Sequence, residues 1–150
     1  MLFSKSCVYG LRATLFLASK EDEEHTSIRE LSEELDISFH FLTKILQQLT
    51  EVDLLESKKG PKGGVRLTKP AEEISLLDIV VAIDGDELFK ECVLGLPGCG
   101  IDKPCPLHSI WAENRDDIQK MLETQTLLDM AEKGKQQNLR VTADGKFEWG

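Results

Sequence analysis

The 150-residue sequence predicts a mainly α-helical fold with one small β-hairpin and a long helix near the C-terminal end. Three observations lead to this prediction. Apolar residues recur at helical spacing through most of the first 50 positions. A glycine-rich basic stretch then separates two short apolar runs, which is typical of a hairpin. After a segment rich in cysteine, glycine and proline, a helical pattern of about 25 residues begins.

The first part of the chain predicts three helices, over residues 4–19, 27–35 and 39–52. One side of the third helix is apolar at the spacing of a buried face: Leu42, Ile45, Leu46 and Leu49. Another side repeats hydrogen-bonding and cationic groups: His40, Thr43, Lys44 and Gln47. Ser38 suits the N-cap of this helix. Two helices joined by a three-residue turn match a helix-turn-helix, although an ordinary helical hairpin fits the segment equally well.

Residues 54–57 and 65–68 predict two strands joined by a basic tip. The span 57–69 contains no acid and five cations: Lys58, Lys59, Lys62, Arg66 and Lys69. Glycines let such a tip approach a phosphate ribbon, and the lysines supply the counter-charge. A basic hairpin that follows a recognition helix is a wing, whereas the alternative is a solvated turn without a ligand. Residues 1–84 are therefore predicted to form a winged helix-turn-helix domain.

The charge of the chain is unevenly distributed. The net charge is −9, yet residues 1–70 carry 10 Lys/Arg and 11 Asp/Glu, so the acidity belongs mainly to the second half. Because distant charges are screened beyond about 8–10 Å at physiological salt, the local basic patch can still meet phosphate. The acidic half should repel non-specific DNA, which favours a selective binder.

Residues 85–108 are predicted to form a cysteine-rich sensor loop. Three cysteines and a histidine follow in the pattern Cys-x6-Cys-x5-Cys-x2-His, at Cys92, Cys99, Cys105 and His108. Glycines and prolines between them prevent helix or strand, so a metal held by thiolates and imidazole would order the loop. Alternatives are a structural zinc site, a reversible disulfide without a cluster, and control by a protein partner.

A short helix opened by a capping box at Ser75 and Asp78 and stopped by Gly85 precedes the loop. Residues 109–134 predict a long helix that ends at Gly134. Its apolar seam is expected to pack against a second copy of the chain or against the first helix: Ile110, Trp111, Ile118, Met121, Leu122 and Leu128. The tail 135–150 is compatible with a small hairpin or with disorder.

These segments together resemble a family of winged-helix regulators, the iron–sulfur cluster assembly regulators and nitric-oxide-sensing repressors. The resemblance extends over residues 1–133. It rests on the first helix with residues 4–6 and 9–13, the helix-turn-helix at 27–49, the wing at 59–65, the helix at 74–84 and the spaced cysteines. It implies a homodimeric transcription factor that binds double-stranded DNA under the control of an iron–sulfur cluster.

The resemblance implies that Cys92, Cys99 and Cys105 are ligands of iron. His108 matches the histidine ligand of the assembly regulators, which favours a [2Fe–2S] over a [4Fe–4S] cluster, although the first gap is one residue longer than their pattern. The nitric-oxide sensors take a fourth ligand from the partner's first helix, at about position 8. Val8 stands there in this chain, and Cys7 beside it is either such a ligand or, more simply, a small apolar residue.

The predicted operator has two-fold symmetry, with residues 39–47 in the major groove and the wing in the minor groove. The recognition segment supplies the candidates for base or phosphate contact, and the wing supplies backbone contacts: Ser38, His40, Phe41, Thr43, Lys44, Gln47, Lys58, Lys59 and Lys62. No apolar run is long enough for a membrane span, and four cysteines without a secretion signal favour a cytoplasmic protein. No catalytic motif is present, so an enzyme is the least favoured class.

Overall fold

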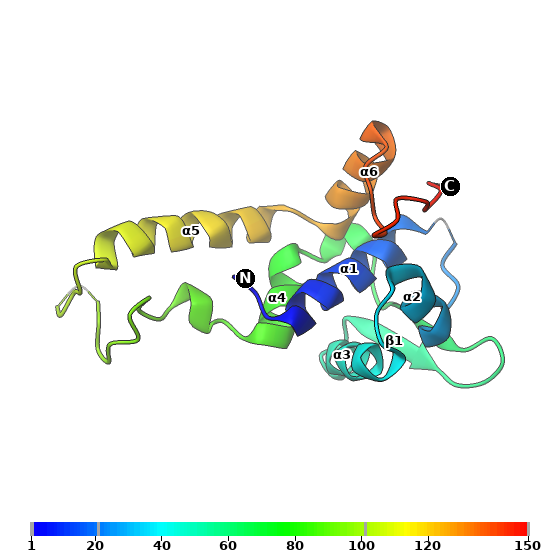
Figure 1. Ribbon diagram of the computed structural model, residues 1–150, viewed down its shortest axis with the longest axis horizontal. Coiled ribbons are helices and arrows are strands. Elements are labelled where there is room, and N and C mark those ends of the chain that lie inside the picture. The colour runs from blue at the N-terminus through cyan, green and yellow to red at the C-terminus, as the bar shows by residue number, and fades with distance from the viewer. Residues whose placement is uncertain (1, 21, 101, 150) are drawn as a thin grey trace.

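The computed structural model describes residues 2–20, 22–100 and 102–149, and it is helical apart from a two-stranded sheet (Figure 1). The head contains α1 (Lys5–Ser19), α2 (Ile28–Leu35), α3 (Phe39–Glu51), β1 (Leu55–Lys58), β2 (Gly64–Leu67) and α4 (Leu76–Asp84). Single 3₁₀ turns, η1 (Ala71–Glu73) and η2 (Glu87–Phe89), flank α4. The chain ends with α5 (His108–Thr124) and α6 (Leu127–Gln137). The predicted mainly helical class with a small β-wing is confirmed.

The core of the head lies between α1, α2, α3 and the sheet. The apolar face predicted for α3 is buried, as are Leu31 and Leu35 of α2. On α1 the apolar residues at near-helical spacing, Val8, Leu11, Leu15 and Ala18, lie on a half-buried side. The fully buried side includes Gly10 and Thr14, because α1 packs against α4 and α6 as well as α3. Gly10 allows this close approach, since an added Cβ would collide with Ile83.

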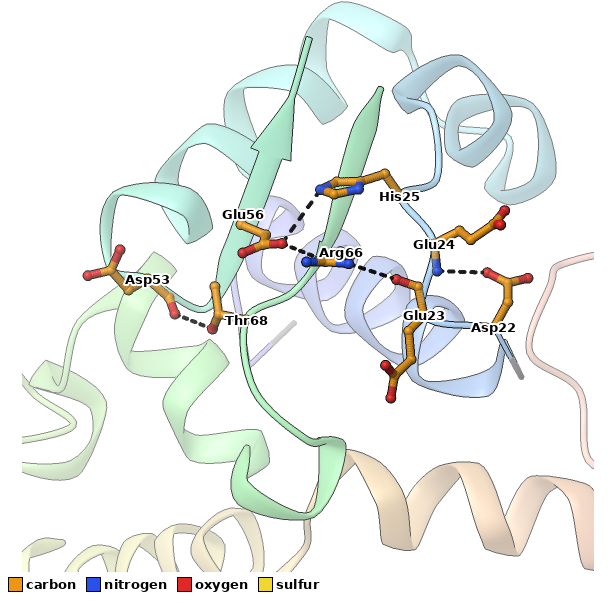
Figure 2. Close-up of polar contacts among 8 residues, drawn as sticks. All are labelled: Asp22, Glu23, Glu24, His25, Asp53, Glu56, Arg66 and Thr68. Atoms are coloured by element: carbon orange, nitrogen blue, oxygen red, sulfur yellow. Dashed lines mark hydrogen bonds and ion pairs between the residues drawn. The ribbon is translucent and has the colours of Figure 1, made fainter. Parts of the chain in front are cut away.

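The wing is fixed to the head by backbone pairing. In the antiparallel sheet Glu56 lies opposite Arg66 and Lys58 opposite Gly64. The second strand also pairs on its other edge, where Thr26 and Val65 exchange N–H···O bonds of 2.9 and 2.8 Å. Figure 2 shows a polar network above this pairing, in which the guanidinium of Arg66 bonds both Glu56 and the backbone carbonyl of Glu23.

Helix α5 leaves the head as an extended arm. In Figure 1 the chain that follows α4 runs outward beside α5, and α5 then returns from the far end of this arm toward the head, so that the cysteine loop lies at that far end. A small apolar cluster holds the arm to the head, and its buried members, which we call the arm-base cluster, are Cys7, Val80, Phe89 and Leu122. None of the helices in the described ranges is long and apolar enough to cross a membrane.

The prediction of one helix over residues 109–134 is wrong. The helix stops at Thr124, and a new one begins at Leu127, where the N-cap residue Thr126 and Asp129 form a second capping box. Residues 75 and 126 form a bridge in which Leu76 N–H bonds Gln125 O (3.0 Å) and Leu127 N–H bonds Ile74 O (2.9 Å). These bonds replace helical ones at the break, and α6 turns back against α1. Gly134 is inside α6, which ends instead at Asn138 in a left-handed conformation.

The tail is ordered without forming strands in its described part, to residue 149. Its turn at Asp144 is held by bonds from Thr142 Oγ1 (2.7 Å) and Lys146 N (3.0 Å) to the carboxylate. Phe147 packs edge-on against Phe16 of α1, and the Trp149 indole covers Gly134. The tail therefore closes over α6, where the sequence left a hairpin and disorder as alternatives.

Gly64→Ala should loosen the wing. Gly64 has φ of +142°, and an added Cβ would collide with the backbone carbonyl of Thr26. We expect the free energy of unfolding to fall by about 3 kcal/mol, from backbone strain and overpacking together. Gly60→Ala is the matched control, because φ is +108° but open space surrounds the position; it should cost about 1 kcal/mol. Equal losses in urea denaturation would contradict this account of how the wing is held.

Candidate DNA interface and cysteine centre

The exposed side of α3 carries several of the predicted contact residues. His40, Lys44 and Gln47 are exposed. Ser38 occupies the N-cap position, but its hydroxyl makes no capping hydrogen bond, which leaves it available to another partner. Thr43 is half-buried and its hydroxyl donates to the Phe39 carbonyl at 2.7 Å, so this oxygen can act outward only as an acceptor.

The two phenylalanines at the start of α3 have opposite placements. Phe41, which the sequence placed among the contact residues, is half-buried and packs edge-on against Tyr9 with ring centroids 5.5 Å apart. Phe39, which the sequence analysis did not select, is 43% exposed and touches the ring of His40. The ring of Phe41 packs in the head and is not proposed as a DNA contact.

The wing presents lysines rather than a uniform patch. Lys58, Lys59 and Lys62 are exposed, and within the described residues none of them forms an ion pair. Arg66 differs, because its charge is paired with Glu56, which also lies 3.6 Å from His25 Nε2 (Figure 2). The acidic loop at residues 22–24 thus borders the wing, a neighbour to which the sequence analysis gave no role.

The cysteine loop brings its ligand-type atoms together. The Sγ atoms of Cys92, Cys99 and Cys105 lie within 4.8 Å of one another, and those of Cys92 and Cys105 are 3.5 Å apart. His108, the first residue of α5, has Nδ1 3.7 Å from the Cys99 sulfur. The loop is otherwise irregular, so this convergence is its main internal order. All four residues are half-buried, which leaves the centre accessible to small reactants.

Local hydrogen bonds set the acidity of these thiols. The backbone amides of Leu96 and Leu94 lower the pKa of Cys92 to about 7, despite some desolvation. For Cys99 the amide of Cys105 acts in the same direction, but desolvation and the neighbouring thiols outweigh it and raise the pKa. Cys92 therefore becomes a thiolate, the form that binds metal, more readily than Cys99.

Cys7 is a different kind of cysteine. It is fully buried in the arm-base cluster, where burial and the nearby carboxylate of Asp84 raise its pKa to about 12. A thiol held neutral in this way is a poor metal ligand. The burial of Cys7 supports its interpretation as a small apolar core residue, which the sequence favours over a fourth metal ligand.

The carbonyl of Glu91 connects the cysteine loop to α5. It accepts hydrogen bonds from Trp111 Nε1 at 3.1 Å and from the Arg115 guanidinium at 3.3 Å. Glu91 directly precedes Cys92, and Phe89 two residues earlier is buried in the arm-base cluster. Trp111 and Arg115 of α5 thereby fix the position of Cys92, the first cysteine of the loop. The sequence pattern alone predicts for Trp111 only a place in the apolar seam.

Comparison with known proteins identifies relatives along most of the chain. Residues 3–133 match the model of the Rrf2 family, described as an iron-dependent transcriptional regulator. The HTH-type transcriptional regulator NsrR of Oceanobacillus iheyensis is 32% identical over 131 residues, 87% of this chain and 89% of the relative. The structure of CymR (YrzC), the global cysteine regulator of B. subtilis, aligns with a TM-score of 0.75 and 26% identity over 87% of this chain and 96% of that one. The oxidized form of Staphylococcus aureus CymR aligns with a TM-score of 0.68 and 32% identity over 88% and 97% of the two chains.

Thiol alkylation should distinguish the cysteines in metal-free, reduced protein. Because the thiolate is the reactive form, Cys92 should react with iodoacetamide faster than Cys99 at neutral pH, with its rate rising through about pH 7. Cys7 should stay unmodified until the protein unfolds. Peptide mass spectrometry across pH 5–10 measures both. Native labelling of Cys7 at the rate of Cys92 would contradict the burial described here.

Proposed function

We propose, from the premise that this chain belongs to the Rrf2 family of transcriptional regulators, that it is a homodimeric DNA-binding regulator controlled by an iron–sulfur cluster. Its relatives are transcriptional regulators, and the chain is a regulator rather than an enzyme. The observation that carries the proposal is the convergence of three thiols and one imidazole in a loop with little other order. Cys92, Cys99, Cys105 and His108 would hold the cluster.

The donor set fits iron–sulfur chemistry. Thiolates are the usual cluster ligands, and imidazole replaces thiolate in some [2Fe–2S] centres. The low pKa of Cys92 favours a thiolate at neutral pH, and His108 supports [2Fe–2S] over [4Fe–4S]. When bound, the cluster would supply one-electron redox chemistry and sensitivity to oxidants.

The chain's own residues then convert cluster binding into a change of shape. Cys92 is tied to α5 through the Glu91 carbonyl, and His108 is the first residue of that helix. Ligation at both positions would join the outgoing and returning halves of the arm. Since a ligand shifts an equilibrium only by its differential affinity for two states, the cluster must favour one arrangement of the arm. In a dimer, the distance between the two recognition helices would change with the arrangement of the arm. Binding to an operator requires this distance to match the spacing of its two half-sites.

The dimer contact is proposed for the outer side of α5. The predicted seam divides in the structure: Leu122 is buried and Ile118 packs with it in the arm-base cluster, whereas Ile110 and Met121 are 64% and 51% exposed. Val81 of α4 is also exposed. A second copy would cover these side chains and remove apolar surface from water.

One observation favours a second candidate, a cluster-free thiol switch. The Cys92 and Cys105 sulfurs lie 3.5 Å apart, at hydrogen-bond distance, so a side-chain movement of about 1.5 Å would bring them to the length of a disulfide bond. With hydrogen peroxide as oxidant, the two thiols would lose two electrons and two protons to form one disulfide, and the peroxide would be reduced to two water molecules. The oxidized relative noted above is consistent with such chemistry in that protein only.

Anaerobic purification followed by iron, sulfide and zinc counts and a visible spectrum decides between these candidates. We expect equal iron and sulfide in the wild type, no cluster in a folded Cys99→Ala dimer, and a retained cluster in the control Cys7→Ala. Operator affinity should differ between cluster-bound and apo protein. Equal affinities would overturn the sensor proposal, zinc alone would indicate a structural site, and a Cys92–Cys105 disulfide that changes affinity in metal-free protein would support the switch.

Trp111→Phe should make the cluster more labile without unfolding the protein. The change removes the Nε1 donor to Glu91 and keeps an aromatic ring. We expect the bleaching half-time in air to shorten several-fold while the initial iron content is unchanged. Trp149→Phe is the matched control, because it loses an equivalent 3.1 Å bond to the Leu139 carbonyl in the distant tail. Identical half-times in both variants would remove Trp111 from the coupling.

Lys59→Ala should weaken binding to all DNA sequences alike. Loss of one phosphate contact should flatten the slope of log affinity against log salt by about 0.9. Lys120→Ala removes the same charge from the exposed surface of α5 and should leave that slope unchanged. His40→Ala and Lys44→Ala should instead alter the preferred sequence. A changed consensus for the wing variant, seen by selection from random DNA, would reverse these assignments.

A further inference from the structure

Phe39 is an exposed aromatic residue at the start of the recognition helix. Among the described residues it is the only aromatic side chain in the group of exposed large apolar residues, with 43% of its surface accessible. Most of the others lie in the arm or on its seam. Phe39 is the first residue of α3, and its ring meets that of His40 edge-on with centroids 5.9 Å apart.

The position of Phe39 separates it from the proposed dimer contact. Figure 1 shows α3 and α5 on opposite sides of the head. A second copy on α5 would therefore leave Phe39 uncovered. The residues on either side of it, Ser38 and His40, are also exposed, and Ser38 retains a free hydroxyl. In helix-turn-helix proteins the N-terminal residues of this helix contact base edges in the major groove.

We propose that Phe39 reads the 5-methyl group of a thymine in the major groove, so that it fixes one base pair of each half-site. The inference rests on the proposed DNA-binding function and adds a residue and a base identity to it. Thymine alone places a methyl group on the major-groove edge, and apolar side chains, phenylalanine included, recognise it by contact. Cytosine presents an N4 amino donor near the same place, which an apolar ring cannot pair.

The neighbouring residues give this contact its specificity. The His40 ring limits the space around Phe39 on one side, and its nitrogens can bond the edge of an adjacent base. Phe41 cannot take the same role, because its ring packs on Tyr9 inside the head. The apolar side chain of Phe39 therefore lies beside the polar side chains of Ser38 and His40. The half-site should contain a thymine next to a base whose major-groove edge accepts a hydrogen bond from His40 or donates one to it.

Deoxyuridine substitution tests the contact directly, because it removes only the methyl group. A duplex is first selected from random DNA with the full-length, anaerobically purified protein, and each thymine is then replaced in turn. We expect wild-type affinity to fall about fourfold at one thymine per half-site, the effect of one buried methyl group. Phe39→Ala should bind the parent duplex more weakly and show no further loss with deoxyuridine there. Phe39→Leu, which keeps apolar surface, should retain part of the sensitivity.

Val52→Ala is the matched control, since Val52 is 50% exposed just beyond the other end of α3. It should keep the full fourfold effect. The inference would be overturned if the wild-type affinity did not change on replacing any thymine by deoxyuridine, or if Phe39→Ala lost as much affinity as the wild type on that replacement. Either result would leave DNA binding itself intact. Absence of any selected DNA with the wild type would instead contradict the proposed function. Circular dichroism and oligomeric state confirm that each variant is folded.

Discussion

The arm-base cluster is the contact on which the position of the cysteine loop depends. Phe89 is buried there with Val80 of α4, Cys7 of α1 and Leu122 of α5, so one small apolar group joins the head to both halves of the arm. Beyond it the loop has hydrogen bonds to α5 at Glu91 but little packing of its own. A binding event at the thiols reaches the head through this junction and through the end of α5, which the bridge between residues 75 and 126 ties to the start of α4, because the loop lies at the far end of the arm (Figure 1).

Features encoded by local chemistry were predictable from the sequence. Ser75 and Asp78 form the capping box that their spacing predicted, and Gly85 ends the helix with φ of +78°. The wing has its predicted strands because glycines and lysines between apolar runs permit little else. The convergence of the three thiols was also predictable, since a loop broken by glycine and proline needs another source of order. In each case a few neighbouring residues decide the outcome.

The missed features depend on contacts distant in sequence. Thr126 and Asp129 carry the same capping signature as Ser75 and Asp78, but the apolar pattern continues across them and suggested one helix. The bridge between residues 75 and 126 favours two helices with a break between them. Helical periodicity cannot predict a contact between residues that lie 51 positions apart in the sequence. Likewise, helical spacing could not tell which phenylalanine of α3 turns inward. The position of Tyr9 on α1 decides that Phe41 is the packed one.

The charge arrangement explains how an acidic chain can select a DNA site. Of the wing cations, Arg66 is paired with Glu56, and the acidic loop stands beside the wing. The attraction proposed between the wing and the phosphate backbone would then rest mainly on Lys58, Lys59 and Lys62, opposed by a net charge of −9. Non-specific affinity depends on the number of phosphates neutralised, so it should be low. The base contacts proposed for Phe39, His40 and Lys44 would then supply a large share of the binding energy. In such a protein a small change in half-site spacing removes much of the affinity, because the backbone contacts that remain are few.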